Sequence, residues 1–463
     1  RKVFHEKIAR AIETLYPERL EEFCEMLALH YSRSEEQEKA YHYLKLSGDK
    51  AYSRFANWEA YRYYREAIAV CNRLPQTESV RRMGVEARFC LFPPAIYLGF
   101  PDDALQFFKE GADESRKLGE LRKAAEFEAR LTSVYAFKGK PILAAQHGER
   151  CFEEAERIAD LDMMAGVARD LCAAYAFRGA YRKVLILTSK VIPLLEKENR
   201  HEVYGKSGNF HGRLCIWAGM ALGYLGRFGE GIASCEKARR AALRYNNTAG
   251  IGFSEMTKGV ISNVRGDGKA AVEHLQRARE IHERMNATVM LGPTWANLGY
   301  GHMLQGDPET GQKHAEQGLD IQIKAGLPYQ LSSIHLILGE CSLRLHDREK
   351  TLYHVKESLR LARLHEERHI EGQALMLLGW NPTRFDSLES RQMEILLQES
   401  LSIFTDLGTR PHCALAHLHL GQAYTENGQT EKAREHLRTA AGMFQEMGMG
   451  YWLKMSQDAQ EGL

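Results

Sequence analysis

The sequence has no long apolar run and almost no net charge. Its hydrophobic stretches, such as residues 184–187, are far shorter than the roughly 18 residues that a membrane-spanning helix needs. Lysine plus arginine number 62 and aspartate plus glutamate number 61, so the net charge is +1. Such a balance gives no overall attraction to phosphate backbones or anionic lipid. We therefore expect neither a nucleic acid nor a membrane among the partners of this chain.

Paired cysteines are also missing. The nine cysteines are scattered, no CxxC pair occurs, and most lie in apolar helical segments, as do Cys172, Cys215 and Cys341. Zinc-knuckle spacing is thereby absent, and we expect reduced, buried thiols in a cytoplasmic protein. The first residues carry no apolar signal core and no initiating Met, so we expect the chain to begin inside a longer polypeptide.

What the sequence does contain is a repeat. Glycines recur at steps of 40 residues, with a single step of 42, and four of them follow a leucine. Inside a helix a glycine costs about 1 kcal/mol relative to alanine. Its regular return therefore indicates that a neighbouring helix approaches closely at each of these positions. The series is Gly219, Gly259, Gly299, Gly339, Gly379 and Gly421.

A second marker follows seven residues after most of these glycines. It is again glycine, except that His346 takes the place once, and a small residue stands five positions further on. Glycine suits the left-handed residue that ends a helix, and the small residue suits a close helix contact. The second markers are Gly99, Gly139, Gly179, Gly226, Gly266, Gly306 and Gly428, and the small residues are Ala104, Ala144, Gly231, Ala271, Gly311 and Ala433.

Residues 295–307 and 420–433 resemble the first helix and turn of a tetratricopeptide repeat. The standard unit has about 34 residues, whereas this one is near 40, which adds nearly two helical turns per hairpin. No stretch shows sustained strand alternation. We therefore predict an all-α protein, a tetratricopeptide-like α-α superhelix (a right-handed solenoid) with a period near 40 residues.

The organisation that we predict has three parts. Residues 1–75 form an N-terminal helical junction with the first hairpins, and residues 76–447 form the repeat superhelix of roughly nine hairpins. Residues 448–463 form a capping helix or tail. Pro93 and Pro94 interrupt one first helix, and residues 380–387 break the repeat register after Gly379.

Residues 4–13, 15–19, 27–31, 38–51 and 57–68 follow an order that is similar to the junction region of a large bacterial family. Its members carry an adenylate/guanylate cyclase-like or other effector domain, a signal-transduction ATPase (STAND-type) domain and tetratricopeptide repeats. The region also resembles that of ATPase-linked transcription activators. The resemblance covers the whole chain loosely and residues 1–75 most closely. It implies that this chain is the C-terminal sensor or scaffold arm of such a protein.

Two short motifs suggest chemistry. Residues 365–369 match HExxH, in which His365 and His369 would hold zinc. The motif falls where one hairpin ends and the next begins, and no third ligand follows at a familiar spacing, so the turn interpretation is the stronger one. Gly205-Lys206-Ser207 resembles the end of a phosphate-binding loop, but Arg200 stands where its first glycine belongs. We expect no catalytic residue, no cofactor and no enzyme activity in this chain.

The remaining candidate is the concave groove. In this repeat type the first helix of each hairpin lines the inner surface, and counting from each mid-helix glycine selects side chains that should face it. Their amides, charges and rings suit a protein or peptide partner, including the upstream domains of the same polypeptide. A small-molecule or signalling-peptide sensor is the alternative, and a zinc hydrolase the remote one. The predicted groove residues are Arg213, Trp217, Tyr224, Phe253, Asn263, Asn297, Tyr300, Glu340, Arg344 and Gln422.

Overall fold

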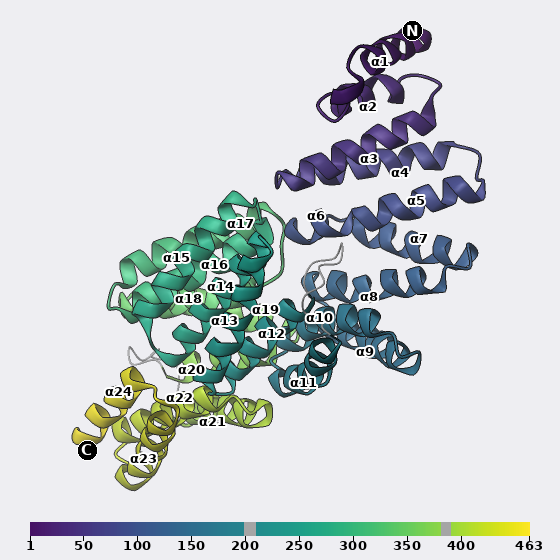
Figure 1. Cartoon of the computed structure of the whole chain (residues 1–463). Helices are drawn as coiled ribbons and strands as arrows, with labels where there is room; N and C mark the ends of the chain where they lie inside the picture. The colour runs from purple at the N-terminus through teal and green to yellow at the C-terminus, as the bar shows by residue number, and fades with distance from the viewer. Residues whose placement is uncertain (199–209, 381–389) are drawn as a thin grey trace. The chain divides into compact units, whose positions relative to one another are not determined.

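The computed structural model describes residues 1–198, 210–380 and 390–463, and it is helical throughout this part of the chain (Figure 1). No strand occurs among these residues, which confirms the all-α prediction. None of the helices described is both long enough and apolar enough to cross a membrane.

The chain divides into two compact units. The first comprises Arg1–Val134 with Arg284–Thr288, and the second comprises Tyr135–Glu283 and Val289–Leu463. This division falls within the range 76–447, which the sequence analysis treats as one array.

The first unit is a stack of antiparallel helices. Its elements are α1 (Lys2–Leu15), a short 3-10 helix (Pro17–Arg19), α2 (Cys24–Ser32), α3 (Gln37–Ser53), α4 (Asn57–Arg73), α5 (Glu78–Cys90), α6 (Phe92–Tyr97) and α7 (Ala104–Lys117). The predicted interruption by proline is confirmed, since α5 ends just before Leu91 and Pro93 lies in the first turn of α6. Proline is tolerated there because the first turn of a helix needs no N–H donor.

In the second unit, inner and outer helices alternate. The inner helices are the end of α8 (Leu121–Phe137), which belongs to this unit from Tyr135 onwards, α10 (Leu161–Phe177), α12 (Phe210–Tyr224), α14 (Thr248–Arg265), α16 (Thr288–Leu304), α18 (Leu331–Arg344), α20 (Arg368–Gly379) and α22 (Arg410–Glu426). The outer helices are α9 (Pro141–Arg157), α11 (Tyr181–Lys197), α13 (Phe228–Arg244), α15 (Gly268–Arg284), α17 (Pro308–Lys324), α19 (Arg348–Leu364), α21 (Ser390–Leu407) and α23 (Thr430–Met447), and α24 (Gly450–Glu461) follows them.

The inner helices are buried on nearly every side. In α14, 13 of 18 residues are buried, whereas α15, its partner in the same hairpin, buries only 5 of 17. A helix that is apolar around its whole circumference needs neighbours on all faces, whereas an outer helix needs a single apolar stripe. The inner helices therefore form the interior of the superhelix.

Both glycine series have the predicted roles. Gly226 and Gly266 end inner helices with φ of +85° and +87°, and His346 takes the equivalent place with φ of +58°. At the mid-helix position of Gly219, an added Cβ would lie 2.5 Å from Sγ of Cys235, and at Gly421 it would lie 2.6 Å from Cγ of Leu437. The close approach of the outer helix therefore leaves no room for a side chain there.

Successive turns of the second unit touch each other. The ring of Phe137, at the end of α8, lies 4.9 Å from that of Tyr329, just before α18. Tyr224, at the end of α12, lies 6.1 Å from His412 in α22. At the end of α14, a Cβ added to Gly266 would lie 2.7 Å from Nε1 of Trp452 in α24. Each contact joins two hairpins that are five apart along the chain, so one turn of the superhelix takes about five hairpins.

Candidate functional site

Five aromatic rings fill the first part of the interior of the second unit, and we call them the inner aromatic cluster. Trp217 lies 6.3 Å from Phe177 and 5.6 Å from Phe253, while Tyr329 lies 4.8 Å from Phe177. Trp217 is 6% exposed and Phe253 is 4% exposed. These two predicted groove residues therefore pack against the chain's own rings. The cluster consists of Phe137, Phe177, Trp217, Phe253 and Tyr329.

Arg213 borders this cluster. Its guanidinium carbon lies 4.4 Å from the centroid of the Phe253 ring, a cation–π contact. Burial and the charge of Arg213 lower the pKa of His282 to about 4. The neutral imidazole of His282 forms a hydrogen bond with Thr294 (Nδ1 to Oγ1, 3.0 Å). The guanidinium of Arg213 thus lies near an aromatic ring and a neutral histidine.

Tyr224 belongs to the contact between successive turns. Its ring stacks on Tyr181 at 4.4 Å and meets the imidazole of His369 edge-on at 4.8 Å. Burial raises the pKa of Tyr224 to about 12 and lowers that of His412 to about 3. All four groups are therefore uncharged at neutral pH, as an interface without water requires.

Five polar side chains of the later inner helices are less buried than the inner aromatic cluster, and we call them the polar row. Arg344 is exposed, while the other members are half-buried. Burial raises the pKa of Glu340 to about 7, although Arg344 and a hydrogen bond with Tyr300 act in the opposite direction. The carboxyl group of Glu340 is therefore largely withdrawn from water. The polar row consists of Asn297, Tyr300, Glu340, Arg344 and Gln422.

Asn263 lies beside the polar row and has an unused acceptor. Its Nδ2 donates to the carbonyl oxygen of Asn297 at 2.9 Å, and Nδ2 of Asn297 donates to the carbonyl oxygen of Pro293 at 2.9 Å. Oδ1 of Asn263 is buried and has no hydrogen-bond partner among the residues described. A Cβ added to Gly301 would lie 3.4 Å from this oxygen, so the oxygen faces the neighbouring inner helix α16.

Two further residues belong beside the polar row and were missed in the sequence. Nδ1 of His419 lies 3.0 Å from Oε1 of Gln422, and the imidazole stacks on Trp380 at 4.1 Å. A signal for both was present in the repeat. His419 precedes Gly421 by two residues, as Trp217 precedes Gly219, and Trp380 follows Gly379 directly, as Tyr300 follows Gly299.

The HExxH residues form a turn. His365 follows the last residue of α19, Glu366 has φ of +55°, and α20 begins at Arg368. His365 and His369 therefore do not lie one turn apart on a continuous helix, as zinc coordination by this motif requires. His369 instead lies 3.3 Å from His412 (Nε2 to Nδ1). In the part of the chain that the structure describes, no three His, Cys, Asp or Glu residues are placed to hold a metal.

Gly205-Lys206-Ser207, the other motif considered for chemistry, lies outside the described residues. The same is true of Arg200 and of residues 381–387, at which the sequence predicts a break in the repeat register.

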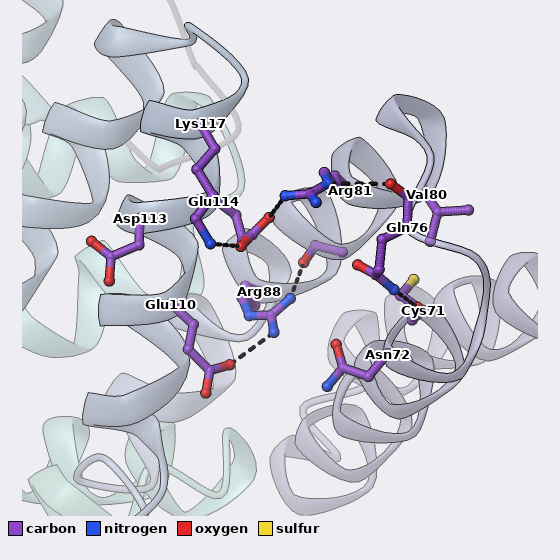
Figure 2. Close-up of a pocket in the computed structure, with 11 residues that line it drawn as sticks. Cys71, Asn72, Gln76, Val80, Arg81, Arg88, Glu110, Asp113, Glu114 and Lys117 are labelled. Atoms are coloured by element: carbon purple, nitrogen blue, oxygen red, sulfur yellow. Dashed lines mark hydrogen bonds and ion pairs between the residues drawn. The ribbon is translucent and has the colours of Figure 1, made fainter.

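A separate cleft of about 330 Å³ lies in the first unit, between α4, α5 and α7 (Figure 2). Glu114 accepts from Lys117 at 2.6 Å and from Arg81 at 3.1 Å. Arg88 donates to Glu110 at 2.8 Å and to the carbonyl oxygen of Gly84 at 3.1 Å. Nε of Arg88 is buried without a partner among the residues described. The charges that line this cleft are thus balanced, and one buried donor is left over.

Comparisons with known proteins bear on the fold. No family model matches the chain, and no curated protein matches its sequence. The structure of NprR in complex with its cognate peptide NprX is similar at a TM-score of 0.54 and 11% identity, covering 78% of this chain and 99% of that one. A Rap protein complexed with competence and sporulation factor gives a TM-score of 0.48 at 11% identity, covering 88% of this chain and 98% of that one.

A STAND protein with a tetratricopeptide repeat sensor from Pyrococcus horikoshii gives a TM-score of 0.41 at 12% identity, covering 94% of this chain and 74% of that one. At such identities the likeness concerns fold alone, and of these three structures NprR has a TM-score above 0.5. The chain is a tetratricopeptide-like α-α superhelical repeat protein, as its sequence predicts.

Proposed function

We propose that the second unit binds an extended peptide, or an extended segment of a protein partner, along the polar row. The observation that carries this proposal is the presence, on successive inner helices, of polar side chains such as Glu340 and Gln422 that are not fully buried. A peptide backbone offers N–H donors at regular intervals, and carboxyl and amide oxygens such as theirs accept hydrogen bonds from such donors. The inner aromatic cluster is already filled by the chain, so the polar row is the part of the interior that remains for a partner.

The comparisons with known structures support a peptide as the partner of the polar row. The NprR and Rap structures contain a cognate peptide and the competence and sporulation factor, respectively. Chains of the same architecture thus bind peptides or factors. We further propose that this chain is a non-catalytic sensor or scaffold of a larger cytoplasmic signalling protein of the STAND or cyclase-like type. Its own upstream domains are then candidate partners.

A selection of random peptides displayed on phage tests the binding site. The chain is compared with a variant that carries Tyr300→Ala, Glu340→Gln and Gln422→Ala. We expect peptides to be enriched on the natural chain and to lose at least tenfold in affinity on the variant, because the variant lacks three polar-row side chains. Arg434→Ala, on the exposed face of α23, is the matched control and should leave binding unchanged.

Circular dichroism verifies that the variant stays folded. Peptides that bind the variant as well as the natural chain would place the binding surface elsewhere, and a selection without enrichment would remove the proposal.

The cleft of the first unit favours a second candidate function, the sensing of a small zwitterion such as a free amino acid. Arg88 supplies a buried N–H for a carboxylate, and Asp113, which also lines the cleft, supplies a carboxylate for an ammonium group. Thermal shifts with single amino acids at millimolar concentration test it. We expect Asn72→Trp, at an exposed cleft position, to abolish a shift that Glu66→Trp, outside the cleft on the same helix, preserves. The absence of any shift would exclude this function.

A further inference from the structure

Glu340 is a carboxylate without a counter-ion. Among the described residues no ion pair within 4 Å involves it, although Arg344 stands one helical turn further along α18. The hydrogen bond from Tyr300 and the charge of Arg344 only partly offset its desolvation, which leaves the pKa of this carboxyl at about 7. A carboxyl group placed in this way gains more than an exposed one from an added positive charge, because solvent screens the new pair less.

The repeat register relates Glu340 to two aromatic residues. Tyr300, Glu340 and Trp380 directly follow the mid-helix glycines of α16, α18 and α20. Tyr300 and Glu340 therefore occupy equivalent positions on α16 and α18, whereas Trp380 comes directly after the last residue of α20, and all three are half-buried. Aromatic rings together with a carboxylate are the composition of sites that bind ammonium or guanidinium groups, since ring faces also attract cations.

The other residues near Glu340 differ from it in charge. Gln422 continues the row on α22 and forms its hydrogen bond with His419. Burial lowers the pKa of His419 to about 4, so this imidazole is neutral at pH 7 and does not repel a cation. Arg344 is the nearby competing charge, but it is exposed and free to turn towards solvent. Within the polar row, Glu340 is thus the one acidic group, and Arg344 is the one group that opposes a cation.

We propose that Glu340, with Tyr300 on α16 and Trp380 just after the end of α20, forms a subsite for a cationic group of the partner, an ammonium or guanidinium group carried by a basic peptide. This inference rests on the proposed function and specifies which peptides the polar row prefers. A bound cation shifts Glu340 to its charged form, so binding releases up to about half a proton per peptide at pH 7.

The charge of the selected peptides tests the subsite. The phage selection is repeated on the natural chain, on Glu340→Gln, on Glu340→Arg and on the control Glu349→Gln, an exposed carboxylate on the outer helix of the same hairpin. We expect Lys or Arg to be enriched at one position on the natural chain and on the control. Glu340→Gln should lose that enrichment, and Glu340→Arg should replace it with Asp or Glu. Arg344→Gln should tighten the binding of a basic peptide, the opposite of Glu340→Gln.

Calorimetry with one selected basic peptide gives a second readout. Titrations at pH 7 in buffers of different ionisation enthalpy count the protons released, which should approach half a proton on the natural chain and zero on Glu340→Gln. A count of zero on the natural chain would contradict the subsite. Peptides that need the polar row but show no basic preference would overturn it while leaving the proposed function intact. If no peptide is enriched on any chain, both fail.

Discussion

The inner aromatic cluster and the polar row of the second unit occupy positions of the same repeat but differ in how they are packed. Trp217 and His419 both lie two residues before a mid-helix glycine, yet Trp217 packs among the rings of the inner aromatic cluster and His419 lies beside the polar row. The difference arises because Phe137 at the end of α8, Tyr181 at the start of α11 and Tyr224 at the end of α12 meet the starts of α18, α20 and α22 one superhelical turn later. A repeat position is thus fully buried where the rings of a following turn pack against it and only half-buried at the members of the polar row such as Glu340.

Truncating a tyrosine side chain should show the largest difference in stability between the inner aromatic cluster and the polar row. Tyr329→Ala removes a ring that contacts Phe137 and Phe177 and leaves a cavity, so we expect a loss of about 3–5 kcal/mol in the free energy of unfolding. Tyr300→Ala removes a half-buried ring of the polar row and should cost about half as much or less. Urea unfolding followed by tryptophan fluorescence measures both. Equal losses would mean that the polar row is core as well.

Acid should weaken the contact between turns. Burial holds the pKa of His412 at about 3, below its ordinary value near 6.5, so the unfolded chain takes up a proton that the folded chain does not. The stability linked to this group is fully present above pH 6.5 and is lost as the pH falls towards 3. From pH 7 to pH 5 we expect a loss of about 2 kcal/mol from His412 alone.

The variant His412→Gln isolates that contribution. Raised carboxyl pKa values, such as that of Glu367 at about 7, act in the opposite sense because their stability is lost as the pH rises through 4.5 to 7. The difference in pH dependence between the natural chain and His412→Gln removes such common contributions. Unfolding free energies of the two chains that run parallel between pH 7 and pH 5 would show that His412 is accessible to protons in the folded state.

Glycine substitutions test how much the close contacts between inner and outer helices contribute to stability. Gly219→Ala forces a methyl group to within 2.5 Å of Sγ of Cys235, and we expect it to cost about 1–3 kcal/mol. Gly442→Ala is the matched control. This glycine lies on the exposed face of α23, and a Cβ added to it would meet no atom of a neighbouring element within 4 Å, so the change should stabilise the helix by up to about 1 kcal/mol. Thermal unfolding compares them, and a destabilised Gly442→Ala would refute the packing argument.

The smallest effect concerns the HExxH turn. Glu366 holds φ of +55°, which glycine adopts without strain, so Glu366→Gly should leave the chain equally stable or stabilise it by up to about 1 kcal/mol. In a zinc hydrolase the same change would remove the catalytic base. Unfolding curves together with metal analysis of the purified protein distinguish the two cases, and stoichiometric zinc would contradict the turn interpretation.

Much of the fold was readable from particular residues. Gly226 and Gly266 marked helix ends, and His346 was identified as their substitute, because the left-handed conformation restricts which residues fit. The site was readable only in part. Counting from Gly219 placed Trp217 on the inner face, but the count carried no information about Tyr329, which fills the space in front of Phe177.

The sequence by itself determined the all-helical architecture, the period near 40 residues and the positions of the close helix contacts, because each of these follows from interactions within one hairpin or between neighbouring hairpins. Only the tertiary structure decided which inner positions are covered. Residues some 190 in sequence apart, such as Phe137 and Tyr329, meet because of the small rotation between hairpins summed over a whole turn. That sum separates the inner aromatic cluster from the polar row, where Glu340 remains half-buried.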